Sequence, residues 1–324
     1  MQKIYIIGAG QLGSRHLQAL KHVRLPLAIT VIDPSADSLA VARERYDAFA
    51  TGQHIHQIEY TQHIPHSSEQ IDLAIVATNA NIRKEVVTEA LQNNCIKYMI
   101  LEKLLFQKSA DFRETDRLLS EVGTTAWVNC SMRVMPFYRA AKQEIAGNKI
   151  LYQVTGSQYG LVTNAIHYLD HIAYLTGALD YELDTAMLDY PPIPSKRKGY
   201  LELSGNLTAR YADGSMGVIT CYPGGNAPVQ VEILSQNVRM IVREAEGKAW
   251  VSRAGEDWQW TEADARILYQ SEMTAGLVED ILGQGTCNLT PYRDSVKVHL
   301  NLLEPLLSFL NNYTQEKSAL YPFT

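Results

Sequence analysis

Cysteines, long apolar runs and basic residues are scarce in this sequence, and each scarcity excludes a class of protein. The four cysteines lie far apart and form no C-x-x-C pair, so neither a zinc site nor a redox dithiol is predicted. No apolar run approaches the roughly 18–20 residues of a membrane span, and Ile4–Ile7 is too short for a signal peptide. We therefore expect reduced thiols, a cytoplasmic location and no membrane partner.

The charge of the chain favours a small-molecule partner over a nucleic acid. The 29 Lys and Arg residues against 35 Asp and Glu residues give a net charge of −6, whereas nucleic-acid binders usually carry a basic patch. A cluster of histidines lacks acidic or cysteine partners at ligand spacing, so no metal site is predicted; it consists of His54, His56, His63 and His66.

A length of 324 residues predicts two domains, and the first is an α/β domain over residues 1–128. Short apolar runs alternate there with helical patterns, which is typical of βαβ units and of a doubly wound parallel sheet of the Rossmann type. The predicted strands include Ile4–Ile7, Ala28–Ile32, Leu73–Ala77 and Tyr98–Leu101. Apolar runs bounded by turn residues suit strands that are buried on both faces.

Residues 129–324 predict a second domain of the α+β class with a mostly antiparallel sheet. Long β-like stretches occur at Leu151–Ser157, Tyr200–Tyr211, Ser215–Tyr222 and Val229–Arg243. The turn Ala212-Asp213-Gly214-Ser215 joins two of them, and Asp-Gly between alternating runs is a strong hairpin signal. An exposed sheet face rich in Tyr and Val favours a homo-oligomer.

The motif Gly8-Ala9-Gly10-Gln11-Leu12-Gly13 follows a predicted strand and opens an amphipathic helix, which is the context of a dinucleotide-binding loop. Gly8 allows the tight turn, Gly10 lets the backbone approach a pyrophosphate, and Gly13 allows the helix to pack closely. The N-terminus of the following helix favours the anionic phosphates. We predict that the whole loop binds the cofactor.

Asp33 ends the second predicted strand 20 residues after Gly13, where a carboxylate accepts hydrogen bonds from the adenosine ribose. Its charge would repel a 2′-phosphate, so the sequence favours NAD as the cofactor. NADP remains an alternative.

Three further segments extend the match: Val76-Ala77-Thr78-Asn79, Leu101-Glu102-Lys103 and Thr163-Asn164-Ala165-Ile166-His167. With the glycine motif, which continues to His16, they make the chain resemble the glucose–fructose oxidoreductase, inositol dehydrogenase and MocA (Gfo/Idh/MocA) family over nearly its whole length. Asn79 and Leu104 stand where that family commonly has proline, and Thr163 stands where it has aspartate.

The resemblance implies a hydride transfer between the nicotinamide and a sugar, a polyol or a nucleotide sugar. It places Lys103 beside the nicotinamide, Glu102 at its ribose and Thr78 and Asn79 at the cofactor. Hydride transfer from an alcohol needs a base and a group that stabilises the alkoxide, for which Lys103 and His167 are suitable types. The predicted substrate contacts are Lys103, Arg133, Thr163, Asn164 and His167.

Two alternatives stay open: a catalytically inactive NAD(P)-binding sensor on the same fold, and a reductase of a non-sugar carbonyl or imine. A basic loop, Ser195-Lys196-Arg197-Lys198, could engage a phosphate or a nucleotide-linked sugar, although such charge runs are usually solvated. Asp170 and His16 are predicted to have structural roles.

Overall fold

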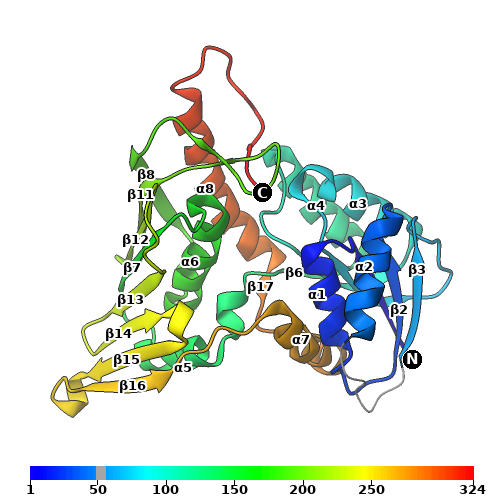
Figure 1. Ribbon diagram of the computed structural model, residues 1–324, viewed down its shortest axis with the longest axis horizontal. Helices are drawn as coiled ribbons and strands as arrows, with labels where there is room; N and C mark the ends of the chain where they lie inside the picture. Colours follow the sequence, from blue (N-terminus) through cyan, green and yellow to red (C-terminus); the bar gives the residue numbers. More distant parts are fainter. Residues whose placement is uncertain (49–55) are drawn as a thin grey trace. The chain divides into compact units, whose positions relative to one another are not determined.

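The computed structural model describes residues 1–48 and 56–324 and divides the chain into two compact units (Figure 1). The first unit comprises residues 1–129 and 268–292, and the second comprises residues 130–267 and 293–324. The sequence analysis placed one boundary, between residues 128 and 129. The chain instead returns to the first unit for one helix and one short strand, which pack on elements formed by the first 129 residues.

The first unit contains a seven-stranded sheet in the order β17-β6-β5-β4-β1-β2-β3. Its strands are β1 (Gln2–Ile7), β2 (Leu27–Ile32), β3 (Gln57–Thr61), β4 (Ile71–Val76), β5 (Ile96–Leu101), β6 (Thr125–Val128) and β17 (Thr290–Pro291). All neighbours pair in parallel except β17, which runs antiparallel to β6. The predicted doubly wound Rossmann sheet is confirmed.

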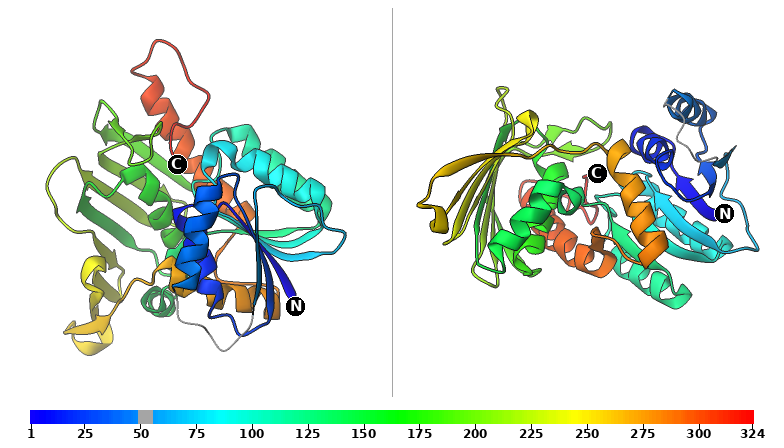
Figure 2. Two further views of the ribbon diagram at one scale, coloured as in Figure 1. Left: turned by 45° about the vertical axis from the view of Figure 1, so that its right-hand side comes forward. Right: turned by 90° about the horizontal axis from the view of Figure 1, so that it is seen from below.

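Helices cover both faces of this sheet, which is why its central strands are apolar along their length (Figures 1 and 2). The helices are α1 (Gln11–Leu20), α2 (Ala36–Asp47), α3 (Ala80–Asn93), α4 (Ser109–Val122) and α7 (Gln270–Gln284). The returning helix α7 packs against α1 and buries Met273, Leu277, Val278 and Ile281. This apolar stripe explains why residues 268–292 belong to the first unit.

The second unit contains an eight-stranded sheet in the order β16-β15-β14-β13-β7-β12-β11-β8. The strands are β7 (Leu151–Ser157), β8 (Tyr181–Leu188), β11 (Gly205–Tyr211), β12 (Met216–Tyr222), β13 (Gln230–Leu234), β14 (Val238–Arg243), β15 (Lys248–Arg253) and β16 (Trp260–Asp264). Only the β7–β12 pair is parallel, so the prediction of a mostly antiparallel sheet is confirmed.

The helices of the second unit lie on one face of this sheet, as the right-hand view of Figure 2 shows. They are α5 (Pro136–Ile145), α6 (Leu161–Thr176) and α8 (Tyr292–Asn311), with short 3₁₀ turns at Ser131–Val134, Glu244–Glu246 and Ala254–Glu256. A two-stranded hairpin, β9 (Ile193–Pro194) and β10 (Leu201–Glu202), stands apart from the main sheet. Within the described residues, no helix is both long and apolar enough to cross a membrane.

Local sequence explains the predicted turn and one difference. The Asp213-Gly214 turn joins β11 to β12 as predicted, with Gly214 at φ +87° and its N–H donating to the Tyr211 carbonyl (3.0 Å). The run Val229–Arg243, in contrast, is two strands, because the Ser235 hydroxyl accepts the backbone N–H groups of Asn237 and Val238 and turns the chain.

Candidate active site

The first candidate site is the crevice at the carboxyl ends of β1 and β4, where the strand order of the sheet reverses. Gly8 ends β1 at φ +95°, and a Cβ atom there would lie 3.0 Å from the Ala77 carbonyl carbon. A Cβ atom on Gly13 would lie 1.7 Å from the Gly8 carbonyl oxygen. The turn and the helix that follows it can therefore be built only with glycine at both positions.

Gly10 differs from these two glycines because it borders open space. A Cβ atom built on Gly10 meets no described atom within 4 Å, and no described side chain caps α1 at this residue. Among the described residues, the first N–H groups of α1 therefore have no side-chain cap. This arrangement fits a pyrophosphate, which would bind at the helix N-terminus and occupy the space beside Gly10.

Asp33 stands at the end of β2 beside the glycine loop. Its Oδ2 accepts the Ala9 N–H (2.7 Å) and its Oδ1 accepts the Ser35 N–H (2.9 Å), so the carboxylate is fixed in place. The same side chain borders a cavity of about 400 Å³. Other predicted cofactor residues that line this cavity are Gly8, Gly10, Thr78 and Asn79.

Glu102 follows β5, the next strand of the sheet, and belongs to a closed ring of hydrogen bonds between five side chains. Its Oε1 accepts Asn129 Nδ2 (2.6 Å) and lies 3.0 Å from His16 Nε2. His16 Nδ1 lies 2.8 Å from Thr274 Oγ1. Gln270 closes the ring, since its Nε2 donates to Thr274 Oγ1 and its Oε1 accepts Asn129 Nδ2, both at 2.8 Å.

The ring keeps Glu102 ionised although the side chain is only 3% exposed. Burial raises the pKa of Glu102, but the hydrogen bond and charge of His16, the Asn129 amide and the charge of Lys103 together lower it to about 2. An ionised carboxylate can only accept hydrogen bonds, so His16 Nε2 carries a hydrogen. The ring thus ties the residue before Lys103 to both α1 and α7.

Arg83 fixes the chain on the other side of Lys103. This α3 side chain is 1% exposed, and its guanidinium donates to the carbonyls of Thr78, Leu104 and Leu105, the last at 2.8 Å. It therefore links the turn after β4 to the turn after β5. The peptide bond between Lys103 and Leu104 is cis. Lys103 itself is half-buried.

In the second unit, Thr163 and Asn164 lie in the first turn of α6, whose N-cap is Gly160. Their surroundings include a carboxylate that the sequence did not reveal, Glu202 of β10. Its oxygens accept the N–H groups of Val162 (2.9 Å) and Thr163 (3.1 Å) and the Thr163 hydroxyl. A negative charge is thus present beside Thr163, where the resemblance led us to expect an aspartate.

Further along α6, His167 lies one turn beyond Thr163 and is half-buried. Arg133, a predicted substrate contact, forms a buried two-pronged ion pair with Asp170, with Nε–Oδ2 at 2.6 Å and Nη2–Oδ1 at 2.9 Å. Two of the three guanidinium nitrogens of Arg133 are engaged in holding α6, and Asp170 has the structural contact expected of it.

Residues 2–130 match the model of an oxidoreductase family described as having an NAD-binding Rossmann fold, GFO_IDH_MocA. The N-terminal domain belongs to the Gfo/Idh/MocA family. No curated protein matches the chain in a sequence search.

Beyond the Gfo/Idh/MocA domain, solved structures share the fold of nearly the whole chain. An oxidoreductase from Agrobacterium radiobacter, solved with NAD⁺, L-tartaric acid and magnesium, has a TM-score of 0.72 at 16% identity, with 93% of this chain and 94% of that chain covered. UDP-N-acetylglucosamine 3-dehydrogenase from Acidithiobacillus ferrooxidans has a TM-score of 0.69 at 14% identity, with 94% of this chain and 96% of that chain covered. The transcriptional regulator Gal80p from Kluyveromyces lactis has a TM-score of 0.70 at 13% identity, with 93% of this chain and 90% of that chain covered.

Several contacts of the site residues were not predicted from the sequence. Arg83 carried a usable signal, because it falls on the same helical stripe as the buried Ala80, Val87 and Ala90. Gln270 and Thr274 gave none, since nothing local shows that a helix that begins 141 residues after Asn129 returns to it. Glu202 lies in a two-residue strand and gave no signal either.

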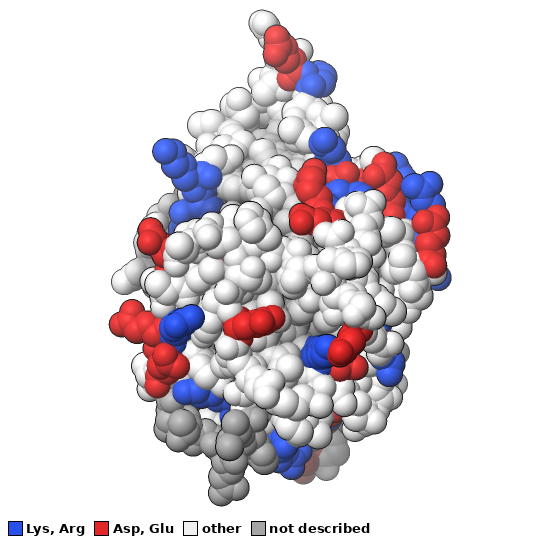
Figure 3. All heavy atoms as spheres, turned by 90° about the vertical axis from the view of Figure 1, so that its right-hand side faces the viewer, with Lys and Arg blue, Asp and Glu red and all other residues white. Residues whose placement is uncertain are grey.

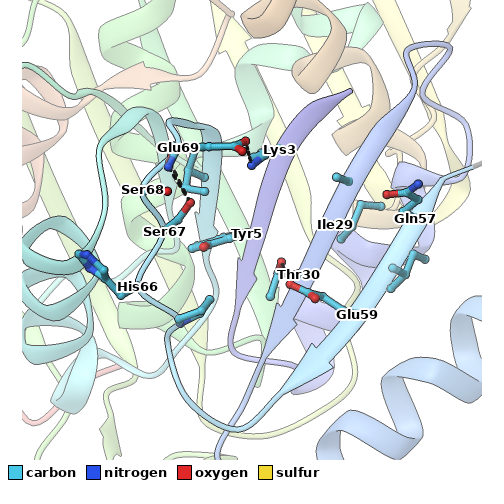
Figure 4. A pocket seen from close by; sticks show the side chains of 14 residues that line it. Lys3, Tyr5, Ile29, Thr30, Gln57, Glu59, His66, Ser67, Ser68 and Glu69 are labelled. Carbon is cyan, nitrogen blue, oxygen red and sulfur yellow. Dashed lines mark hydrogen bonds and ion pairs between the residues drawn. The ribbon is translucent and has the colours of Figure 1, made fainter.

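A separate hollow of about 580 Å³ in the first unit lies away from the cofactor crevice (Figure 4). It is lined by the early residues of β1 and β2, including Lys3 and Thr30, and by the loop that carries Ser67 and Glu69. Lys3 pairs with Glu69, and Thr30 Oγ1 donates to Glu59 (2.7 Å). Ligands of open α/β sheets bind at the carboxyl ends of the strands, so this hollow is not the dinucleotide site.

The surface charges and the metal-binding side chains bear on the sequence predictions of no nucleic-acid and no metal partner. On the face shown in Figure 3, acidic and basic side chains are interspersed, without a continuous basic band over the described residues in view. Among residues 1–48 and 56–324, no group of three or more His, Cys, Asp or Glu is placed to hold a metal ion. His54 of the histidine cluster lies outside the described residues.

Proposed function

We propose that this protein transfers a hydride between NAD and a hydroxyl or carbonyl carbon of a sugar, a polyol or a nucleotide sugar. The observation that carries the proposal is the anchoring of Lys103. The residue before it is held by the buried ring around Glu102, and the carbonyls after it are held by Arg83. A strand-end lysine fixed on both sides, at the edge of the sheet that binds the dinucleotide, is suited to chemistry on a bound substrate.

In this proposal NAD is the hydride acceptor, and side chains of the protein transfer the proton. Lys103 hydrogen-bonds the substrate oxygen and stabilises the charge that develops on it. His167 is the second proton-transfer group, with Thr163 and Asn164 as substrate contacts on the same helix. Asp33 gives the preference for NAD, because its fixed carboxylate would repel a 2′-phosphate.

The test is turnover of a panel of polyols, sugars and nucleotide sugars with NAD and, in parallel, with NADP. We expect NAD to be preferred and the Lys103→Ala variant to lower kcat about 100-fold or more while the Kd for NADH changes little. Lys97→Ala is the matched control, since Lys97 is an exposed residue of β5, the strand that precedes Lys103. Equal loss in both variants, or full activity in Lys103→Ala, would refute the role of Lys103.

A second candidate function is an NAD(P)-binding regulator. It is supported by the fold shared with the regulator Gal80p and by threonine at position 163. Tight NADH binding without turnover of any panel member would favour it. Turnover of carbonyl or imine compounds in the reducing direction alone would instead favour a reductase of non-sugar substrates.

We further propose a homo-oligomer formed through the face of the eight-stranded sheet opposite α6 and α8. This face carries apolar side chains such as Met216 and Val218 in β12, next to polar ones. Covered sheet faces are the rule for surfaces of this kind. Light scattering that gives the mass of a single chain would refute this proposal.

A further inference from the structure

A cavity of about 390 Å³ lies in the second unit at the start of α6. It is bordered by the first turn of α6, the β9–β10 hairpin and the end of β12, and its walls include Tyr159, Asn164 and Tyr222. The volume falls within the range of about 300–1,000 Å³ that is usual for small-molecule sites. The aromatic rings supply apolar surface. The Asn164 amide nitrogen already donates to the carbonyls of Tyr159 and Gly160, so a ligand would meet its oxygen as an acceptor.

The helix N-terminus inside this cavity is already occupied by a carboxylate of the chain. Glu202 is 5% exposed and accepts hydrogen bonds from Val162 and Thr163. These N–H groups would otherwise attract an anionic ligand. An anion that enters the cavity must therefore be held elsewhere.

Two cations of the β9–β10 loop provide that place. Lys196 and Arg197 line the cavity, and Arg197 Nη1 reaches Thr324 Oγ1 (3.5 Å), another lining residue. The loop backbone is ordered by the bonds of Ser195 N–H to the Tyr200 carbonyl (2.9 Å) and of Tyr200 N–H to the Arg197 carbonyl (3.2 Å). Lys196 and Arg197 thus border a cavity in which the carboxylate of Glu202 is already engaged by the helix start and the Thr163 hydroxyl.

We infer that this cavity binds a sugar derivative carrying one anionic group, a carboxylate or a phosphate, with Lys196 and Arg197 as the groups that recognise the charge. The neutral part of the ligand lies against Tyr159, Tyr222 and Asn164. The inference rests on the proposed function in taking the ligand to be a sugar derivative. In this inference the basic loop Ser195-Lys196-Arg197-Lys198 recognises the ligand and is not merely a solvated run of charges.

Calorimetric titrations without NAD test the inference, using D-glucuronate, D-glucose 6-phosphate and D-glucose as probes. We expect one anionic sugar to bind at least about ten-fold more tightly than D-glucose. The preference should disappear in Lys196→Gln and in Arg197→Gln, and it should weaken as salt rises, since the loop is exposed. The anionic probe that carries the preference tells a carboxylate from a phosphate.

Lys198→Gln is the matched control, because Lys198 belongs to the same loop but lies outside the residues that line the cavity. The inference is overturned if D-glucose binds as tightly as both anionic sugars, if neither glutamine variant changes the preference, or if Lys198→Gln abolishes it equally. Thermal melting confirms that each variant is folded, and either loop variant alone suffices. Anion preference without hydride transfer would refute the proposed function and leave this inference standing.

Discussion

The two units build their sites in opposite ways. In the first unit, the glycine turn of the cofactor crevice is shaped by close backbone contacts, and its glycines lie within six residues of one another. In the second unit, the cavity is made of side chains that come from distant segments, such as Asn164, Arg197 and Glu202. Backbone sites leave a short motif in the sequence, whereas side-chain sites assembled by tertiary contacts leave none.

The surroundings of a buried histidine also differ between the two units. His16 in the first unit contacts an ionised carboxylate and a hydroxyl, so hydrogen-bonding groups face both of its nitrogens. His171 in the second unit lies 2.9 Å from the Tyr152 hydroxyl and packs against the ring of Tyr138, with ring centroids 4.3 Å apart. Burial, and then the charge of Arg133, lower the pKa of His171 to about 3. One histidine is part of a charged network and the other is a neutral core residue.

The largest expected effect separates the glycines of the first unit. Gly13→Ala places a methyl group on the Gly8 carbonyl, so we expect cofactor affinity to fall about 100-fold or more and the melting temperature to drop. Gly10→Ala adds a methyl group in open space, so the protein should melt like the wild type but bind NADH about ten-fold more weakly. NADH fluorescence titration and thermal melting measure both. Equal behaviour of the two variants would contradict the close packing at Gly13.

An intermediate effect is expected in the second unit, where one distant carboxylate caps a helix. Glu202→Ala leaves the first N–H groups of α6 without their acceptor and should lower the free energy of unfolding by about 1–3 kcal/mol. The control is Glu182→Ala, an exposed glutamate of β8, for which we expect a change within about 0.5 kcal/mol. Urea denaturation compares the two. A Glu202→Ala protein as stable as the control would show that the cap contributes nothing.

The effect that is smallest at neutral pH, and that grows only in acid, distinguishes the two histidine environments. Because the pKa of His171 falls from 6.5 to about 3 on folding, the unfolded chain takes up a proton that the folded chain refuses. The contribution of His171 to the free energy of unfolding is complete above pH 6.5 and declines by up to about 1.4 kcal/mol per pH unit as the pH falls toward 3. Glu102, with a pKa of about 2 against 4.5, adds a loss only below pH 4.5.

The variant His171→Asn should therefore flatten the dependence of stability on pH between 6.5 and 4.5. Urea midpoints measured at several pH values provide the comparison. An unchanged slope would mean that His171 does not remain neutral in the folded protein.

Much of the first unit could be predicted from the sequence because its determinants are local. Apolar runs, helical periodicity and the spacing of Gly8, Gly10 and Gly13 identified the parallel sheet and the crevice without any distant contact. The same holds for the Asp213-Gly214 hairpin, where two residues determine the turn. The roles predicted for Lys103 and His167 remain predictions.

Tertiary structure decided what no local pattern can encode. The ring around Glu102 needs α7 to return across the first unit, and the anchoring by Arg83 needs two strand-end turns to meet one helix side chain. The carboxylate beside Thr163 comes from Glu202, 39 residues further along the chain. Hydrogen bonds and ion pairs form between whichever side chains the packed elements bring together, so the sequence by itself determined the elements and the cofactor loop, and only the packed fold determined the partners of the site residues.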